Sequence, residues 1–272
     1  MQRLSASQFS SFRWSFFQDV IRFAGLGFES IGVWRHKIDE IGYETAAEML
    51  DEMRMSVSSL SWAGGFTGSS GRSHRSAIED SIDAIYQAHM IGARCLIIHP
   101  GARNGHTMRH SLRLLRSAID EMLPIAADLG VRLAIEPVLT RDNPWNFLGK
   151  FKSQLEFVRN FEAEHVGLVL DLYHVGRHNE ILENLASIRP YLALIQLADM
   201  GKRHADEENR CLLGQGKIPV TAWLNRLNEI DFDGFLEIEI HGFDLESIPY
   251  ENALTHSRDF VQTASQKTRI AF

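Results

Sequence analysis

Short apolar runs alternate with longer amphipathic segments along the whole chain. Eight runs are too short for helices and are mostly rich in the Val, Ile and Leu of buried strands; they cover residues 4–7, 29–33, 55–61, 94–99, 131–137, 166–171, 192–198 and 235–240. Between them apolar residues return at helical spacing, as at Ile78, Ile82 and Ile85. This alternation predicts a parallel sheet. Eight repeats of it predict closure into an α/β fold, the (β/α)8 TIM barrel.

The length of the chain matches one such barrel. It has 272 residues, and a barrel of this kind takes about 250. No interdomain linker, low-complexity tract or block of like charge divides it, so we expect a single barrel domain over residues 1–272. A Gly/Ser-rich segment, residues 62–72, follows the third strand. It is either a flap over the active-site end of the barrel or a plain surface loop.

Net charge limits the expected partners, and cysteine content and the N-terminal residues indicate the expected location. The chain carries 28 Lys and Arg against 35 Asp and Glu, a formal charge of −7, which disfavours nucleic acid and anionic membranes as partners. Two cysteines, Cys95 and Cys211, give no disulfide framework. The first residues lack the apolar core of a signal peptide. We therefore expect a cytoplasmic protein.

Polar side chains stand at the ends of four successive predicted strands. Glu136 ends the fifth strand, Asp171 the sixth, and Gln196 and Glu239 lie near the ends of the seventh and eighth. In a closed barrel these ends converge on the active-site mouth. Converging carboxylates need a counter-charge, and a divalent cation supplies it. An all-oxygen set favours Mg²⁺ or Mn²⁺ over zinc.

Each of these residues also has a purely structural interpretation. Glu136 alone fits a salt-bridged strand end, and Gln196 alone fits a polar residue within a barrel layer. Glu237 and Glu239 share a strand face because side chains alternate with period two, so one of them could neutralise a nearby Arg. Four successive strand ends favour the metal site over these separate explanations.

Five phrases in the C-terminal half, with one in the N-terminal half, resemble a known family. They are Leu133-Ala-Ile-Glu136-Pro, Gly167-Leu-Val-Leu-Asp171-x-x-His174, Ile195-Gln196-x-Ala-Asp199, Arg210-x-x-x-Gly214-Gln-Gly216 and Leu236-Glu-Ile-Glu239, preceded by Ile98-His99-Pro-Gly101. In this order they resemble the xylose isomerase-like barrels, the sugar phosphate isomerase/epimerase superfamily. That superfamily includes hydroxypyruvate isomerase-like, inosose isomerase-like and ketose 3-epimerase-like proteins.

The resemblance implies one divalent metal ion held by Glu136, Asp171, Gln196 and Glu239. Mn²⁺ or Mg²⁺ is the expected ion, with Co²⁺ or Zn²⁺ as alternatives. Many members have His where this chain has Gln196, but the Gln-x-Ala-Asp phrase is similar to that of hydroxypyruvate isomerase-like members. Glu239 is preferred to Glu237 as the ligand because the second Glu of the Glu-x-Glu phrase matches the family.

This set of residues suits proton transfer next to a carbonyl group. A metal that bridges a carbonyl and the neighbouring hydroxyl lowers the cost of an enediolate, and two carboxylates can then move a proton between adjacent carbons. We assign Glu136 and Glu239 as this catalytic pair. His174 is expected to hydrogen-bond a substrate oxygen. Arg210 is expected to bind a hydroxyl, carboxylate or phosphate group, with Arg203 and His204 as rivals for that role.

Strand ends in the N-terminal half offer further candidates. His99 ends the fourth strand and either contacts substrate, binds a second metal, or makes a structural hydrogen bond. Trp62, together with Trp34 and Phe66, either forms an apolar wall against the sugar carbons or belongs to the core.

The sequence thus predicts a metal-dependent isomerase or epimerase of a sugar, sugar phosphate or inosose. One alternative is a metal-dependent dehydratase or lyase on a polyhydroxylated carbonyl substrate, and a second is a non-catalytic sugar-binding barrel. The apurinic/apyrimidinic endonucleases of the same superfamily are disfavoured, because Asn209-Arg210-Cys211 replaces their Asp-x-His phrase. A small carbohydrate is the expected partner, and a homodimer is compatible with the sequence.

Overall fold

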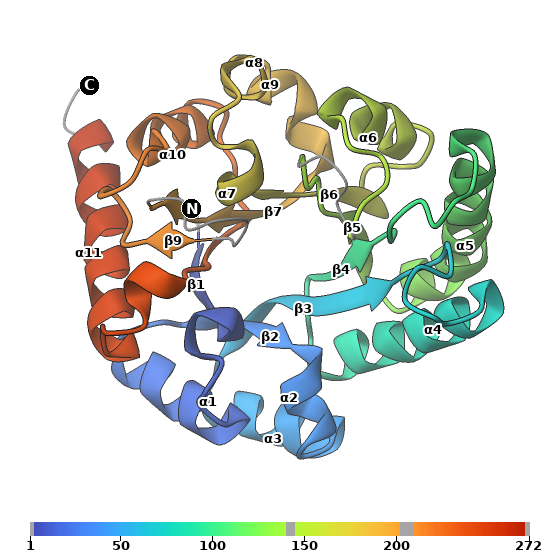
Figure 1. Cartoon of the computed structure of the whole chain (residues 1–272). Helices are drawn as coiled ribbons and strands as arrows, with labels where there is room; N and C mark the ends of the chain where they lie inside the picture. The colour runs from blue at the N-terminus through green and yellow to red at the C-terminus, as the bar shows by residue number, and fades with distance from the viewer. Residues whose placement is uncertain (1–2, 140–144, 202–208, 270–272) are drawn as a thin grey trace.

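A closed barrel of eight parallel strands forms the centre of the computed structural model, which describes residues 3–139, 145–201 and 209–269. All eight predicted strands are confirmed. They are β1 (Arg3–Ser7), β2 (Ser30–Trp34), β3 (Ser56–Gly64), β4 (Cys95–His99), β5 (Arg132–Ile135), β6 (Val166–Asp171), β7 (Leu192–Leu197) and β10 (Phe235–Ile238). Neighbours in sequence pair in order, and β10 pairs with β1 to close the ring (Figure 1).

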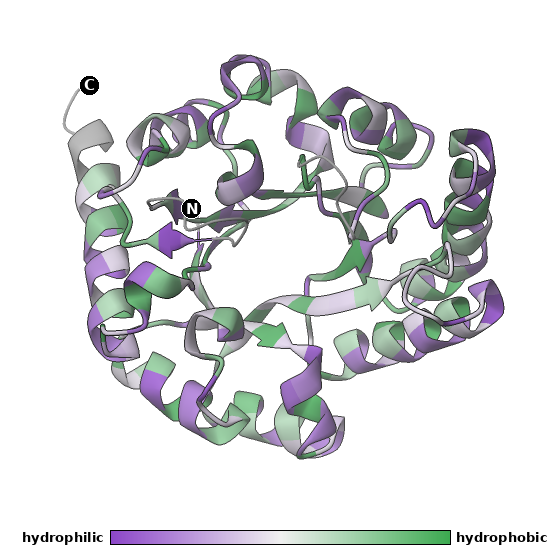
Figure 2. Ribbon diagram, in the orientation of Figure 1, coloured by the Kyte–Doolittle hydropathy of each residue, from purple (hydrophilic) through white to green (hydrophobic). Residues whose placement is uncertain are grey.

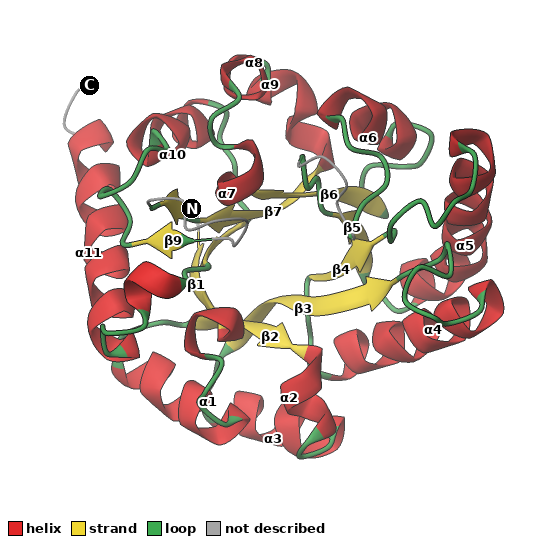
Figure 3. Cartoon of the chain, in the orientation of Figure 1, coloured by secondary structure: helices red, strands yellow, loops and turns green. Residues whose placement is uncertain are grey.

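Helices surround the barrel (Figure 3). The main ones are α1 (Phe16–Gly25), α3 (Tyr43–Glu52), α4 (His74–Met90), α5 (Met108–Asp128), α6 (Phe151–Val158), α10 (Val220–Glu229) and α11 (Tyr250–Arg269). Short helices fill the connections: η1 (Gln8–Ser11), α2 (Arg35–Asp39), α7 (Leu172–Val175), α8 (Asn179–Glu183), α9 (Leu185–Ile188), η2 (Arg189–Tyr191) and η3 (Phe243–Leu245). In the described ranges, no helix combines the length and apolar character needed to span a bilayer.

Local signals fix where the longer helices begin. Ser15 and Gln18 form a reciprocal capping box at the start of α1. Ser73 and Thr107 accept backbone hydrogen bonds at the starts of α4 and α5. The helices are apolar on one side and polar on the other (Figure 2). Their apolar sides pack on the barrel, so most of the core lies between barrel and helices.

A second, smaller group of buried residues explains where the predicted site residues point. It contains Cys95, Ile97, Ala134, Val169, Leu194 and Phe235, from β4, β5, β6, β7 and β10. Because strand side chains alternate, the residue two positions further along each strand faces the same way. Those residues include Glu136, Asp171, Gln196 and Glu237. The apolar filling of the barrel therefore gives way to a polar layer at one end.

Two features differ from the sequence prediction. Residues 62–64 of the Gly/Ser-rich segment belong to β3, and Gly65 and Phe66 donate backbone hydrogen bonds to the carbonyls of His99 and Pro100. This segment thus follows the end of β4 closely. A two-stranded antiparallel hairpin, β8 (Asp199–Met200) and β9 (Arg210–Cys211), was not predicted. It carries Arg210 to the mouth of the barrel.

Candidate active site

The four predicted metal ligands lie at the same end of the barrel. Glu136 follows β5, Asp171 ends β6, Gln196 lies in β7 and Glu239 follows β10. Asp171 is in register with Gln196 on the neighbouring strand. All four are buried, with exposed fractions of 7%, 0%, 2% and 7%. The barrel therefore brings together the residues that the sequence predicted would converge.

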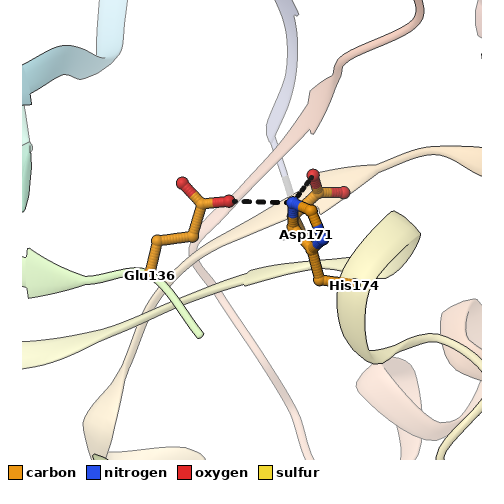
Figure 4. A group of neighbouring side chains, drawn as sticks. All are labelled: Glu136, Asp171 and His174. Atoms are coloured by element: carbon orange, nitrogen blue, oxygen red, sulfur yellow. Dashed lines mark ion pairs between the residues drawn. The ribbon is translucent and has the colours of Figure 1, made fainter. Parts of the chain in front are cut away.

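Glu136, Asp171 and His174 form a compact cluster (Figure 4). His174 Nε2 lies 3.7 Å from Glu136 Oε1 and 3.7 Å from Asp171 Oδ2. One oxygen from each acid and one imidazole nitrogen lie within 4.8 Å of one another, close enough to share a metal ion. Asp171 also caps α7, since its Oδ1 accepts a hydrogen bond of 2.8 Å from the Tyr173 backbone. This cap holds the short helix that presents His174.

Arg210 lies between two of the carboxylates. Its Nη2 is 2.9 Å from Asp171 Oδ2 and 3.4 Å from Glu239 Oε1, and its Nη1 donates to the Glu239 carbonyl at 3.3 Å. The guanidinium is buried and packs over the Tyr173 ring. The substrate contact that the sequence predicts for Arg210 stays a prediction. In the structure its guanidinium is also the counter-charge of two buried acids, Asp171 and Glu239. Its rivals Arg203 and His204 lie outside the described residues.

Gln196 joins Glu239 to the same network. Its Nε2 donates to Glu239 Oε2 at 2.6 Å and to Glu237 Oε1 at 3.1 Å. Ser7 Oγ donates to Glu239 Oε2 at 3.1 Å. Burial raises the pKa of Glu239 to about 8, although Arg210 acts in the opposite direction. The acid is thus held by donors from β1, β7 and β9.

The residues fit a divalent cation. Gln196 Oε1 is buried and has no hydrogen-bond partner among the described residues, which is unusual for a buried amide oxygen. Asp171 is in register with Gln196 on the neighbouring strand, and Glu239 accepts a hydrogen bond from the Gln196 amide nitrogen. Arg210 is a close cation to both of these acids. Carboxylate and amide oxygens are the ligands that hard divalent ions prefer. His174 adds a nitrogen that the sequence analysis did not count as a ligand.

His99 lies on the other side of Glu136. Its Nε2 is 3.4 Å from Glu136 Oε2, and burial lowers its pKa to about 3, so the ring is neutral at pH 7. The ring packs against Trp62 and Trp145, with centroid distances of 5.5 and 5.6 Å. His99 thus connects the acidic cluster to an aromatic wall.

The aromatic wall differs in composition from the predicted one. Trp62 and Trp145 pack edge to face at 5.3 Å, and Trp145 is 44% exposed. Trp145 comes from the connection after β5, where no strand pattern marks it, and the sequence analysis missed it. Phe66 is fully buried in the core, because its segment continues alongside the end of β4. Trp34 packs against Phe9 at 5.0 Å.

The two acids of the Glu-x-Glu phrase have different surroundings. Glu239 is the one near Arg210, at 3.4 Å. Glu237 accepts hydrogen bonds from Ser58 and Ser59 instead, and burial raises its pKa. The structural interpretation that one of the pair neutralises an Arg therefore fits Glu239 and not Glu237. Although Glu239 lies near Arg210, it still accepts hydrogen bonds from Gln196 and Ser7.

Comparisons with known proteins agree with this architecture. A family model described as a xylose isomerase-like TIM barrel matches residues 21–264. The uncharacterized protein MJ1311 of Methanocaldococcus jannaschii is 26% identical over 178 residues, which are 62% of this chain and 58% of that protein. The chain thus spans less than two thirds of that relative. The inosose isomerase of Bacillus subtilis is 24% identical over 210 residues, 75% of this chain and 71% of that protein.

Solved structures resemble the whole chain. The IOLI protein with a bound zinc atom has a TM-score of 0.83 at 18% identity, covering 98% of this chain and 99% of that one. An L-ribulose 3-epimerase has a TM-score of 0.81 at 16% identity, covering 100% of this chain and 97% of that one. At such identities the likeness shows the fold. With its closed eight-stranded barrel and a family model matched over residues 21–264, the chain belongs to the xylose isomerase-like TIM barrel family.

Proposed function

We propose that the protein is a divalent-metal-dependent isomerase or epimerase of a sugar, a sugar phosphate or an inosose. The observation that carries this proposal is the convergence of Glu136, Asp171, Gln196 and Glu239 at one end of the barrel, with the amide oxygen of Gln196 buried and unpartnered among the described residues. The inosose isomerase and L-ribulose 3-epimerase relatives support the substrate class.

Each site residue has a separate role in the proposed reaction. Glu136 and Glu239 approach the cluster from β5 and β10, and one removes a proton from the carbon beside the carbonyl while the other returns one. His174 hydrogen-bonds the substrate oxygen. Trp62 covers the apolar face of the sugar carbons. When bound, the metal supplies stabilisation of the negative charge that develops on the carbonyl oxygen.

The expected ion follows from the donor atoms. Glu136, Asp171, Gln196 and Glu239 offer only oxygen, which favours Mn²⁺ or Mg²⁺. His174, which lies 3.7 Å from both Glu136 and Asp171, would add nitrogen. That addition suits Zn²⁺ or Co²⁺, so these ions are the alternatives.

The test is solvent exchange at the substrate carbon. Ketoses, inososes and their phosphates are incubated with the protein and Mn²⁺ in deuterated water and followed by NMR. We expect deuterium at a carbon next to a carbonyl, and no exchange after chelation. Loss of water or cleavage of a carbon–carbon bond would instead identify the dehydratase or lyase. Binding without any exchange would identify the non-catalytic barrel.

The variant Glu239→Gln tests the proton-transfer assignment. It keeps the size of the side chain and its bond to Gln196, but removes the basic carboxylate. We expect exchange to fall by a factor of about 100 or more, the usual contribution of a general base, while circular dichroism stays unchanged. Exchange at the wild-type rate would show that Glu239 is not part of the pair.

A further inference from the structure

A fully buried carboxylate, Glu237, lies directly beneath the candidate site. It lies in β10, two positions before Glu239, and therefore faces the same barrel interior. Its Oε2 accepts hydrogen bonds from Ser58 Oγ at 2.6 Å and Ser59 Oγ at 2.8 Å, both in β3 on the far side of β1 and β2. The proton-transfer chemistry proposed above gives Glu237 no part.

The barrel makes room for this carboxylate. A Cβ atom at Gly32 of β2 would lie 2.3 Å from Glu237 Oε2, so only glycine leaves that space. Ser58 is itself linked to Ser5 of β1, with 2.7 Å between their hydroxyl oxygens. Strands β1, β2, β3 and β10 thus form a pocket of matching shape and polarity. Residues so arranged fix the position of the Glu237 side chain.

The other oxygen of Glu237 contacts a proposed metal ligand. Glu237 Oε1 accepts a hydrogen bond of 3.1 Å from Gln196 Nε2. An amide has one donor end and one acceptor end, and its orientation follows from its hydrogen bonds. Carboxylates at the donor end require the nitrogen of Gln196 to face them. Gln196 Oε1 is then the end that remains, buried and with no hydrogen-bond partner in the described part of the chain.

We propose that Glu237 is a positioning residue, which orients the Gln196 amide so that its carbonyl oxygen is the atom offered to the metal ion. This inference rests on the proposed function, in which Gln196 is a ligand. The second acceptor of Gln196 Nε2, Glu239 Oε2 at 2.6 Å, belongs to a residue that is itself a proposed ligand. Glu237 is not a proposed ligand, so its acceptor oxygen does not compete with the ion for Gln196 Nε2.

The test measures metal affinity directly, without turnover. Metal-free protein is titrated with Mn²⁺ by isothermal calorimetry, and folding is checked by circular dichroism. Glu237→Met removes the acceptor for Gln196, and we expect Mn²⁺ to bind about 10- to 100-fold more weakly, the usual effect of losing a partner of a metal ligand. Glu237→Gln keeps a carbonyl for Gln196 and turns its nitrogen to the serine hydroxyls, so affinity should stay close to wild type.

Two further variants separate positioning from general packing. Glu237→Asp keeps a carboxylate but shortens its reach towards Gln196, and it replaces the Met variant if that one does not fold. In a Gln196→Ala background the same change at Glu237 should cost no further Mn²⁺ affinity, because a positioning effect acts only through Gln196. Ser59→Ala leaves the acceptor for Gln196 in place and serves as the matched control, with affinity near wild type.

The outcomes distinguish this inference from the function on which it rests. If the wild-type protein binds none of Mn²⁺, Mg²⁺, Co²⁺ and Zn²⁺, the proposed function is wrong. If the wild type binds Mn²⁺ and folded Glu237→Met or Glu237→Asp protein binds it equally well, Glu237 does not position Gln196. An equal loss of affinity from Glu237→Asp with and without Gln196 would also overturn the inference.

Discussion

Arg210 places a positive charge beside two buried acids of the site. It lies 2.9 Å from Asp171 and 3.4 Å from Glu239, and all three are buried. Removing one partner of a buried ion pair costs about 3–5 kcal/mol. We expect Arg210→Met to lower the free energy of unfolding by about this amount in the presence of a chelator, measured by urea titration.

Added metal should reverse part of that loss. A divalent cation would take over the counter-charge for Asp171 and Glu239, so Mn²⁺ should restore more stability to Arg210→Met than it adds to the wild type. Arg210→Lys, which keeps the charge, is the control and should lose less in chelator. Equal stability of wild type and Arg210→Met would show that these acids do not need the guanidinium.

The site residues that the sequence predicted share one property. Glu136, Asp171, Gln196 and Glu239 are placed by strand alternation and barrel closure, which the chain pattern encodes. The role of Trp145 could not be predicted, because its position depends on how an irregular connection packs against Trp62 and His99. The surroundings of Glu237 depend on register across β2 and β3, which no local pattern specifies.

At the scale of elements, a buried ion pair ties together the connections after β1 and β2. Lys37 Nζ of α2 lies 2.6 Å from Asp19 Oδ2 of α1 and donates to the Ser11 carbonyl of η1 at 3.0 Å. Burial raises the pKa of Asp19 to about 6, while Lys37 acts to lower it. The Lys37–Asp19 pair therefore links η1, α1 and α2.

Lys37→Met should destabilise the protein more at pH 8 than at pH 5. Without Lys37, the pKa of Asp19 in the folded protein rises further above its unfolded value of about 3.9. The folded state then binds the proton more tightly, so stability falls as pH rises through the raised pKa. We expect a loss of about 3–5 kcal/mol at pH 8, measured by urea titration at both pH values.

The double variant Asp19→Asn with Lys37→Met removes both charges and is the control. It should recover part of the stability and lose the difference between pH 5 and pH 8. If Lys37→Met alone shows the same loss at both pH values, Asp19 is not the group responsible.

A substitution at Gly32 tests how closely β2 packs against the Glu237 side chain of β10. Because a Cβ atom there would lie 2.3 Å from Glu237 Oε2, Gly32→Ala must displace the carboxylate or the strand. Overpacking of this kind costs about 1–3 kcal/mol, to be measured as a change in the free energy of unfolding. Gly25→Ala is the matched control, since a Cβ atom at the end of α1 would meet nothing within 4 Å. Equal effects of both changes would rule out the contact.

Elements that local sequence specifies were predictable, and elements that tertiary contacts specify were not. All eight barrel strands follow from short apolar runs. The hairpin of β8 and β9 has two residues in each strand, too few for a periodic signal. The helix α7 is a single turn that depends on the cap from Asp171.

For the whole molecule, metal binding should appear as added stability. A ligand that binds only the folded state at about 100 times its Kd adds about 2.7 kcal/mol. For a domain of this size, that is a rise in Tm of several degrees on adding Mn²⁺ to chelator-treated protein. Asp171→Asn should abolish the rise. Glu164→Gln, at an exposed acid that lies near Glu162 and the half-buried His165, should leave it unchanged.

The hydrogen bond between Ser7 and Glu239 has a consequence for how the molecule forms. It joins positions 232 residues apart, and β1 pairs with β10 beside it. Contacts of such high sequence separation form late, because the entropy of closing the chain must be overcome first. The candidate site therefore cannot form stepwise as the polypeptide is synthesised. The last proposed ligand, Glu239, is held by a residue of β1, so the cation-binding geometry exists only after β10 has been synthesised and has paired with β1.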